Sequence, residues 1–343
     1  MTTTKEVTIY DIAMALDISI ATVSRALKND PVVNEKTQKK VFETAEKMGY
    51  RTNHFARNLR NRNTRTIGMI VHELNSSFIT SVLAGVEKVT TEAGYDLIIA
   101  HSSESHHKEV ANAKNLFEKR VDGLIASLSF DTKNLDHFKS FKDKNVPIVF
   151  FDRVVQKGNN TVVIIDNERC GYDAAKHLIK QGCKRIAHIT SSLNRNVYSG
   201  RYEGYLRALK AARIKADENL LIVNDLSENS AIESATKILK MKPMPDGIFI
   251  TNDFVAAVCI RTFKEHGIRI PEDIAIVGFN NDAIAKLIEP SLTTINYPGI
   301  DVGETAARSL LNRLSGNKNI KSPKTIIIPS NLIIRKSSLK KPK

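Results

Sequence analysis

The sequence predicts a small all-α domain at the N-terminus, followed by a larger α/β region built on two doubly wound parallel sheets. Capping residues and helical spacing place three short helices within the first 50 residues. From residue 66 onward, short apolar strands alternate with helical stretches, which is typical of parallel sheets. The 343 residues exceed one typical domain, and 42% of them are hydrophobic, enough for a sizeable core.

The first two helices are expected over about residues 9–16 and 20–27. Thr8 and Asp11 form a capping box before the first helix, and Ser19 offers the N-cap of the second. Two helices separated by about three residues make a helix-turn-helix. The outward face of the second helix carries Ile20, Ala21, Ser24 and Arg25, where a recognition helix reaches bases in the major groove.

A third helix is expected to begin after Asn34 and to end before Gly49, which suits a left-handed C′ position. Four apolar residues of this helix are expected to close the small core: Val41, Phe42, Ala45 and Met48. Three-helix bundles of this kind are common, and most of them do not bind DNA. The helical spacing alone therefore leaves the function open.

The segment 47–65 favours DNA binding because it carries six Lys or Arg residues and no acid. Such a density of positive charge suits phosphate neutralisation. The charges are interleaved with Phe55, Ala56 and Leu59, spaced as one face of a two-turn helix that starts at Asn53.

These motifs resemble the lactose-repressor (LacI/GalR) family of bacterial transcription regulators. The resemblance rests on Thr8-Ile9-Tyr10-Asp11-Ile12-Ala13, Ser19-Ile20-Ala21-Thr22-Val23-Ser24-Arg25, and Ala56-Arg57-Asn58-Leu59 before Thr66-Ile67-Gly68. It implies that residues 53–60 form a hinge helix in the minor groove, where Leu59 wedges into a base step. Thr52 departs from the family, which commonly has proline there. The implied DNA-binding residues are Thr8, Tyr10, Ser19, Ile20, Ala21, Thr22, Ser24, Arg25, Asn34, Asn53, Ala56, Arg57, Leu59 and Arg60.

The net charge of +14 belongs to the two ends of the chain. Residues 1–65 carry 12 basic and 7 acidic side chains, and residues 318–343 carry 8 basic and none acidic. We expect the last residues to form a solvated basic tail. The expected domains are 1–50 (helix-turn-helix), 51–65 (hinge), 66–335 (effector binding and dimerisation) and 336–343 (tail). Within 66–335, one lobe takes about 66–164 and 296–325, and the other about 165–292 and the last strand.

Nine strands are expected in the α/β region, and ligands bind outside the carboxyl ends of such strands. The expected strands are 67–71, 95–100, 123–126, 147–151, 162–166, 185–190, 220–223, 247–251 and 274–279. Asp152 and Arg153, Asn252 and Asn280 directly follow three of them, and Arg201 lies beyond a fourth. Carboxylate, guanidinium and amide groups can each bridge two vicinal hydroxyls, while Phe78, Phe151, Tyr198 or Phe254 could cover a sugar face.

The family resemblance also covers this region and implies a periplasmic-binding-protein-like domain of two lobes that close on an effector. Its motifs are Phe150-Phe151-Asp152-Arg153, Ser199-Gly200-Arg201-Tyr202, Thr251-Asn252-Asp253 and Val277-Gly278-Phe279-Asn280. Asn280 and Ser76-Ser77 depart from the frequent aspartate and Asn-Pro. The implied effector-binding residues are Phe78, Phe151, Asp152, Tyr198, Arg201, Asn252 and Asn280. A sugar or sugar phosphate is the expected effector, and a purine-like or other ligand is the alternative.

Other functions lack their motifs. The sequence has no GxGxxG after a strand and no GxxxxGK[ST], so we expect neither an enzyme nor a cofactor. Cys170, Cys183 and Cys259 have no metal-binding spacing, and adjacent His106 and His107 are poorly placed to chelate, so no metal is expected. Without a signal segment or an apolar run of spanning length, we expect a cytoplasmic protein with no membrane contact.

The expected mechanism couples the site that binds operator DNA to the site that binds the effector. A hinge of about eight residues is too short to be helical alone, so it should order only when two copies meet on DNA. We therefore expect a homodimer, with a tetramer as the alternative, on double-stranded operator DNA that is nearly palindromic. Helices near 78–90 and 111–120 are the expected dimer contact. Effector and operator affinities must then be reciprocally coupled. The protein is expected to be a repressor, with an activator as the alternative.

Overall fold

The computed structural model describes residues 6–50, 63–155, 160–316 and 324–340. The chain divides between Thr64 and Arg65 into two compact units. No helix among the described residues is long and apolar enough to cross a membrane.

The N-terminal unit contains the three predicted helices, α1 (Ile9–Leu16), α2 (Ile20–Ala26) and α3 (Glu35–Lys47). Ser19 accepts a hydrogen bond of 3.1 Å from the Thr22 amide, and Asn34 accepts one of 2.8 Å from the Thr37 amide. Both predicted N-caps are therefore confirmed, as is the positive φ of +68° at Gly49. The small core consists of Ile12, Ala13, Val23, Ala26, Val33, Val41 and Ala45.

Phe42 is not part of this core, so that prediction is wrong. Its side chain is 41% exposed, although Val41 and Ala45 on the same helix are buried. Residues 41, 45 and 48 follow one another at helical spacing and define the inward stripe. Phe42 lies one residue further round the helix and therefore reaches the edge of the bundle.

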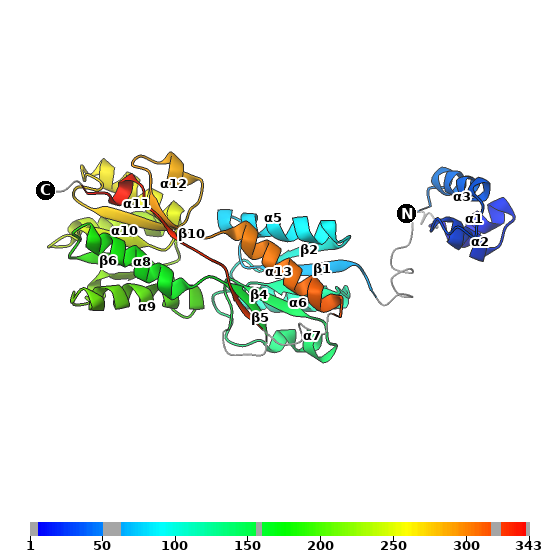
Figure 1. Ribbon diagram of the computed structural model, residues 1–343, viewed down its shortest axis with the longest axis horizontal. Coiled ribbons are helices and arrows are strands. Elements are labelled where there is room, and N and C mark those ends of the chain that lie inside the picture. The colour runs from blue at the N-terminus through cyan, green and yellow to red at the C-terminus, as the bar shows by residue number, and fades with distance from the viewer. Residues whose placement is uncertain (1–5, 51–62, 156–159, 317–323, 341–343) are drawn as a thin grey trace, which may run out of the picture. The chain divides into compact units, whose positions relative to one another are not determined.

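The larger unit contains two six-stranded sheets, each with its own helices, which we call the N-lobe and the C-lobe (Figure 1). The N-lobe sheet has the order β11 (Thr325–Ile327), β5 (Thr161–Ile164), β4 (Ile148–Phe151), β3 (Gly123–Ala126), β1 (Thr66–Val71) and β2 (Asp96–His101). The C-lobe sheet has the order β12 (Leu332–Ile333), β10 (Thr293–Asn296), β9 (Ala275–Asn280), β8 (Gly247–Ile250), β6 (Ile186–Thr190) and β7 (Leu221–Val223).

The predicted fold class is confirmed, with one difference in the C-lobe. All nine strands predicted with bounds are present; β10 and β11 were not predicted, and the last strand, β12, was expected in the second lobe without bounds. The last of these, β12, pairs antiparallel with β10, so the second sheet is mixed rather than wholly parallel. It is also only two residues long, too short to show a periodicity.

Helices cover both faces of each sheet, which explains why the strands read as continuous apolar runs. In the N-lobe, α5 (Ser77–Glu92) and α13 (Gly299–Leu314) lie side by side on one face, and α6 (His106–Glu118), η1 (Asp136–Phe138) and α7 (Lys139–Asp143) cover the other. In the C-lobe, α8 (Asn167–Lys180) and α9 (Asn196–Ala211) pair on one face, opposite α10 (Glu228–Lys240), α11 (Asp253–Glu265) and α12 (Ile284–Leu287).

Residues 336–340, the described part of the expected basic tail, pack two serines against the C-lobe rather than lying free in solvent, which corrects that expectation; residues 341–343 lie outside the described residues. η4 (Lys336–Ser338) ends in two fully buried serines. The Ser337 hydroxyl accepts a hydrogen bond of 2.9 Å from the Thr293 amide, and the Ser338 hydroxyl lies 2.7 Å from His177 Nε2. The small hydroxyl side chains of Ser337 and Ser338 fit between β10 and α8. The basic composition of the tail therefore did not reveal that these serines are buried.

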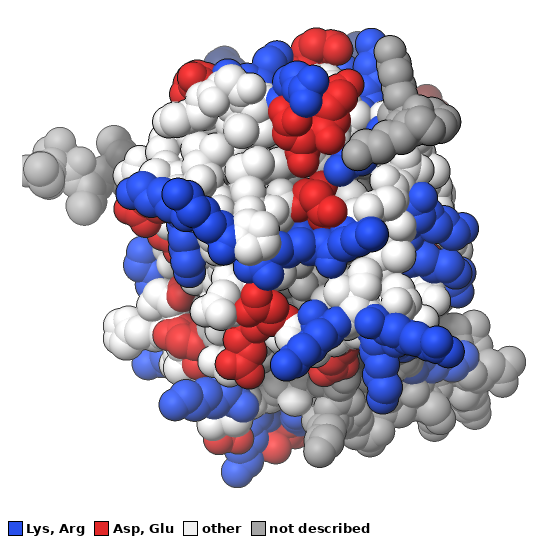
Figure 2. Space-filling view, turned by 90° about the vertical axis from the view of Figure 1, so that its left-hand side faces the viewer, with Lys and Arg blue, Asp and Glu red and all other residues white. Residues whose placement is uncertain are grey.

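The surface of the C-lobe carries charges of both signs. Figure 2 shows the side of the molecule on which this lobe lies, with Lys and Arg interspersed with Asp and Glu. No uniform basic surface is visible from this side, in keeping with the near neutrality of the chain between its two ends.

The helix pair α8 and α9 depends on glycines at its contact. A Cβ atom added at Gly204 would lie 2.0 Å from the backbone oxygen of Glu168. One added at Gly171 would lie 2.1 Å from the backbone oxygen of Arg201. Both contacts are far inside van der Waals distance, so the two backbones approach as closely as they do only because these residues lack side chains.

We predict that Gly204→Ala lowers the midpoint of thermal unfolding by roughly 5–10 °C, because the new methyl group forces α9 away from α8. Gly200→Ala in the same helix is the matched control, since its Cβ would meet Asn167 Cβ at 3.1 Å and the backbone atoms of residues 167 and 168 no closer than 3.5 Å. Circular dichroism melting of both variants would test this packing. Equal midpoints for the two variants would contradict it.

Candidate functional site

The outward face of α2 is available for contact. Ile20 is 39% exposed, Ala21 and Arg25 are also exposed, and Thr22 and Ser24 are half-buried. The inward residues Val23 and Ala26 hold this helix against the small core. The structure therefore presents the predicted base-reading side chains to solvent on one short helix, as a recognition helix requires.

Several of the other predicted DNA contacts also stabilise helix starts. The Thr8 amide donates a hydrogen bond of 2.7 Å to Asp11 Oδ2, and the hydroxyls of Ser19 and Thr22 lie 2.8 Å apart. Tyr10 is 61% exposed, and Asn34 is exposed while it caps α3. The predicted hinge contacts Asn53, Ala56, Arg57, Leu59 and Arg60 lie outside the described residues.

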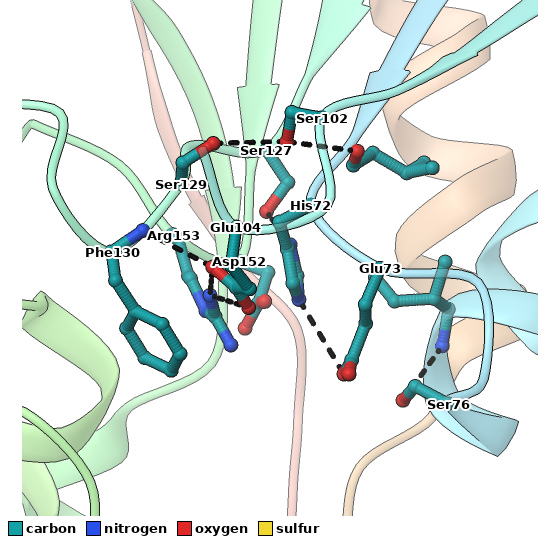
Figure 3. Close-up of polar contacts among 12 residues, drawn as sticks. His72, Glu73, Ser76, Ser102, Glu104, Ser127, Ser129, Phe130, Asp152 and Arg153 are labelled. Carbon is teal, nitrogen blue, oxygen red and sulfur yellow. Dashed lines mark hydrogen bonds and ion pairs between the residues drawn. The ribbon is translucent and has the colours of Figure 1, made fainter. Parts of the chain in front are cut away.

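A second group of polar side chains lies at the carboxyl edge of the N-lobe sheet (Figure 3). His72, Ser102, Ser127 and Asp152 directly follow β1, β2, β3 and β4. His72 Nδ1 lies 2.9 Å from the Ser127 hydroxyl, and the Ser129 hydroxyl donates to that of Ser102 at 2.9 Å. These bonds tie the strand ends into one polar surface, where ligands of parallel sheets bind.

Arg153 is the central cation of this edge, and it joins the two lobes. Its guanidinium is 4% exposed and donates to the two carboxylate oxygens of Glu104 at 2.6 and 2.8 Å. It also donates to the hydroxyl of Tyr198, a C-lobe residue, at 3.2 Å and lies 4.1 Å above the Phe130 ring. Burial opposes the charge, but Tyr198 and Glu104 raise the pKa of Arg153, so the side chain stays protonated.

Asp152 is held by an aromatic pair. The Tyr297 hydroxyl donates to Asp152 Oδ1 at 2.9 Å, and the Phe78 ring stacks on the Tyr297 ring at 4.0 Å. Burial and the Asp152 carboxylate raise the pKa of Tyr297 well above its usual value. Tyr297 therefore stays neutral and keeps its role as a donor. From the C-lobe, Asn196 donates to the Asp152 carbonyl at 2.9 Å.

Arg201 supplies the C-lobe side of the site. It is 4% exposed and donates to Asn167 Oδ1 at 2.9 Å and to the Thr251 carbonyl at 3.2 Å, with its guanidinium 3.5 Å from the centre of the Phe279 ring. Burial lowers the pKa of Arg201. No carboxylate lies within ion-pair distance of it among the described residues. Its positive charge is thus available to a ligand.

The predicted amides Asn252 and Asn280 each follow a residue that Arg201 contacts, Thr251 and Phe279. Asn252 caps α11 by accepting from the Val255 amide at 3.1 Å, and half-buried Asn280 has a φ of +115° at the end of β9. Beside them, Asp253 is fully buried, and burial raises its pKa to about 7. Burial likewise raises the pKa of Asp282 to about 6. These carboxyls therefore take up protons near neutral pH more readily than exposed ones do.

The structure brings most of the predicted effector residues into one region. Asp152, Tyr198 and Arg201 lie together with Phe78, and Asn252 and Asn280 adjoin backbone or ring groups that Arg201 contacts. Phe151 is the exception, because its side chain is fully buried within the apolar core shared with α5 and α13.

Three further residues of the site were not predicted. His72 and Glu104 follow β1 and β2, so the rule that selected Asp152 applied to them as well. Tyr297 follows β10, a strand that the sequence reading did not recognise. The β-branched run 293–295 before Tyr297 was the available signal.

Comparison with known proteins agrees with this geometry. Residues 8–53 match the family described as bacterial regulatory proteins, lacI family, and residues 175–338 match a periplasmic binding protein-like domain. Catabolite control protein A of Priestia megaterium is 31% identical over 97% of this chain and 99% of that protein. Among solved structures, the lac repressor dimer bound to operator and the anti-inducer ONPF has a TM-score of 0.86 at 25% identity, covering 98% of this chain and 100% of that chain. A complex of the transcriptional regulator CelR with cellobiose has a TM-score of 0.73 at 26% identity, covering 97% and 100%.

A helix-turn-helix unit joined to two lobes with a polar site between them defines the protein as a DNA-binding transcription regulator. The chain belongs to the lacI family of bacterial regulatory proteins. The resemblance inferred from the motifs is thereby confirmed.

We predict that Glu104→Gln lowers the free energy of unfolding by about 3 kcal/mol, because it removes the carboxylate that forms the ion pair with the buried Arg153. Glu168→Gln is the matched control: Glu168 pairs with Arg207 at the same N–O distance of 2.6 Å, but both side chains are nearly half exposed. Loss of the exposed Glu168–Arg207 pair should lower the free energy of unfolding by under about 1 kcal/mol. Urea unfolding would measure both values, and similar losses would contradict a special role for the buried pair.

Proposed function

We propose that this regulator binds a near-palindromic operator as a homodimer, most simply as a repressor, and that a sugar bound between its lobes controls operator affinity. The observation that carries the proposal is the constellation around Arg201. The buried Arg201 guanidinium and the Asp152 carboxylate both lie beside Tyr297, whose ring stacks on Phe78, and the Asn280 carbonyl accepts a hydrogen bond of 3.3 Å from the Tyr297 amide. Forked polar groups bridge vicinal hydroxyls, and aromatic faces cover the apolar side of a sugar ring.

The balance of charge supports a neutral sugar rather than a sugar phosphate. Arg153 already has Glu104 as its countercharge, and Asp152 adds a negative charge beside Arg201. A phosphate dianion would bring two further negative charges among Glu73, Glu104 and Asp152, which opposes its entry. The cellobiose held by the related regulator CelR is also a neutral sugar. A purine-like effector is the alternative that binding experiments must separate.

A homodimer is supported by an apolar groove on the C-lobe. The groove has a volume of about 660 Å³ and lies along α10, α11 and α12. Phe254 and Leu287 line it with side chains that are 45% and 83% exposed, so Phe254 does not cover a sugar as expected. Charged residues of both signs surround it, as at the rim of a protein interface. The helices expected to form the dimer contact are α5 and α6, and α5 already packs one face against α13.

We predict that Arg25→Ala weakens binding to the operator by roughly tenfold to a hundredfold, because a base-reading arginine contributes about 1–3 kcal/mol of discrimination. Affinity for an unrelated duplex should change far less. Arg269→Ala is the control, since it removes the same charge from an exposed arginine of the larger unit. Fluorescence anisotropy at one fixed salt concentration would compare them. Equal loss on both duplexes would show that Arg25 contacts phosphate only.

For the effector, we predict that Arg201→Ala weakens sugar binding by about a hundredfold or more, because a buried charged donor is lost. Calorimetry against neutral sugars, sugar phosphates and purine bases would first identify the ligand. Arg207→Ala, an exposed arginine on the same helix, is the matched control and should bind normally. Full affinity in Arg201→Ala would refute the site. Binding of only a purine or a phosphate ester would refute the proposed effector class.

A further inference from the structure

Three potential metal ligands meet in the N-lobe, outside the residues assigned to effector binding. His106 and Glu109 lie on the first turn of α6, three residues apart and so on one face. His137 belongs to η1, 28 positions further along the chain. One ligand atom from each residue lies within 4.8 Å of the others. The sequence reading considered only the neighbouring pair His106 and His107, which cannot converge on one ion.

Three of the four imidazole nitrogens of this cluster are buried and lack hydrogen-bond partners among the described residues. His137 Nε2 lies 2.8 Å from Glu109 Oε1, and His106 Nδ1 lies 4.0 Å from the same oxygen. The short contact to His137 is not aligned as a hydrogen bond, so both nitrogens of that buried ring and Nδ1 of His106 remain without a hydrogen-bond partner among the described residues. Buried polar atoms are normally satisfied, so this group calls for a binding partner.

The carboxylate between the two rings is fixed in place. Glu109 is fully buried, and its two oxygens accept hydrogen bonds of 2.7 Å from the Ser129 amide and 2.9 Å from the Thr132 hydroxyl. Such outer hydrogen bonds orient a carboxylate ligand toward a metal.

We propose that His106, Glu109 and His137 form a binding site for a divalent transition metal ion of the Zn²⁺ type. Two imidazoles and one carboxylate are a ligand set that Zn²⁺ accepts, with the fourth position left to water. At metal–ligand distances of about 2.0–2.2 Å, tetrahedral ligands lie about 3.3–3.6 Å apart. The present N–O distances of 2.8 and 4.0 Å lie on either side of that range.

His106 provides both the route by which an ion enters the site and the ring rotation that completes its coordination. Its side chain is 36% exposed, whereas those of His137 and Glu109 are 4% and 0% exposed. The His106 ring stands nearly perpendicular to that of His137, with centroids 5.1 Å apart. An ion can therefore enter from the His106 side, and a small rotation of this ring completes its coordination while the two buried ligands stay in place.

A metal ion bound at this site would affect residues 129–132, the segment of the N-lobe that contacts the C-lobe. Glu109 holds Ser129 and Thr132, and the Thr132 carbonyl accepts a hydrogen bond from Arg195 of the C-lobe. Phe130 of the same segment lies against Arg153. A bound metal would thus stiffen the segment that meets the other lobe.

The test uses the full chain without an affinity tag, stripped with a chelator and then titrated with Zn²⁺ by calorimetry and with Co²⁺ by visible absorption. The wild-type chain should bind one ion at this site, with cobalt ligand-field bands and a raised melting temperature. His106→Gln should weaken binding by at least tenfold and lose the bands. His106 is partly exposed, so this variant should fold normally, and circular dichroism would verify it.

His107→Gln is the matched control, because His107 is exposed on the same helix and outside the cluster. It should bind both ions as the wild type does. Equal binding by the His106→Gln and His107→Gln variants would place the metal elsewhere and overturn the proposal. An absence of Zn²⁺ and Co²⁺ binding in the wild type would show that Glu109 and His137 form only a buried ion pair.

Discussion

The buried guanidinium of Arg153 is the interaction on which the arrangement of the larger unit depends. A charge removed from water must be paired and hydrogen-bonded, and Glu104 of the N-lobe and Tyr198 of the C-lobe both meet this need. Because one of these partners belongs to each lobe, the separation of the lobes cannot change without changing the environment of this cation. Asp152 repeats the pattern, with contacts to Tyr297 and to Asn196 of the C-lobe.

Much of the fold and of the polar site could be predicted from the sequence, because the rules involved depend on residues that are close together in the chain. The N-caps Ser19 and Asn34 marked helix starts, and apolar runs marked nine strands. The carboxyl ends of parallel strands then pointed to Asp152 in the first sheet and to Asn252 and Asn280 in the second, since strand ends of one sheet meet at one edge. The surface positions on α2 followed from helical periodicity. Their contacts with DNA remain predictions, as do those of the hinge residues.

The remaining features depend on contacts between distant parts of the chain. Phe42 and Phe151 are both apolar and close to predicted sites, but only packing decides that the first is exposed and the second fully buried. Ser337 and Ser338 look like part of a basic tail until His177 and Thr293 are seen beside them. The proposed metal ligands were missed for the same reason, because no periodicity relates η1 to α6.

If a ligand alters the contacts of Arg153 and Arg201, the relative positions of the lobes and the affinity for operator change together. Thermodynamic linkage then requires that the effector changes operator affinity by the same factor by which the operator changes effector affinity. The most direct measurement is a pair of titrations on the full chain, of operator with and without saturating sugar and of sugar with and without saturating operator. The account predicts equal factors, each at least about fivefold. An unchanged operator affinity in saturating sugar would contradict it.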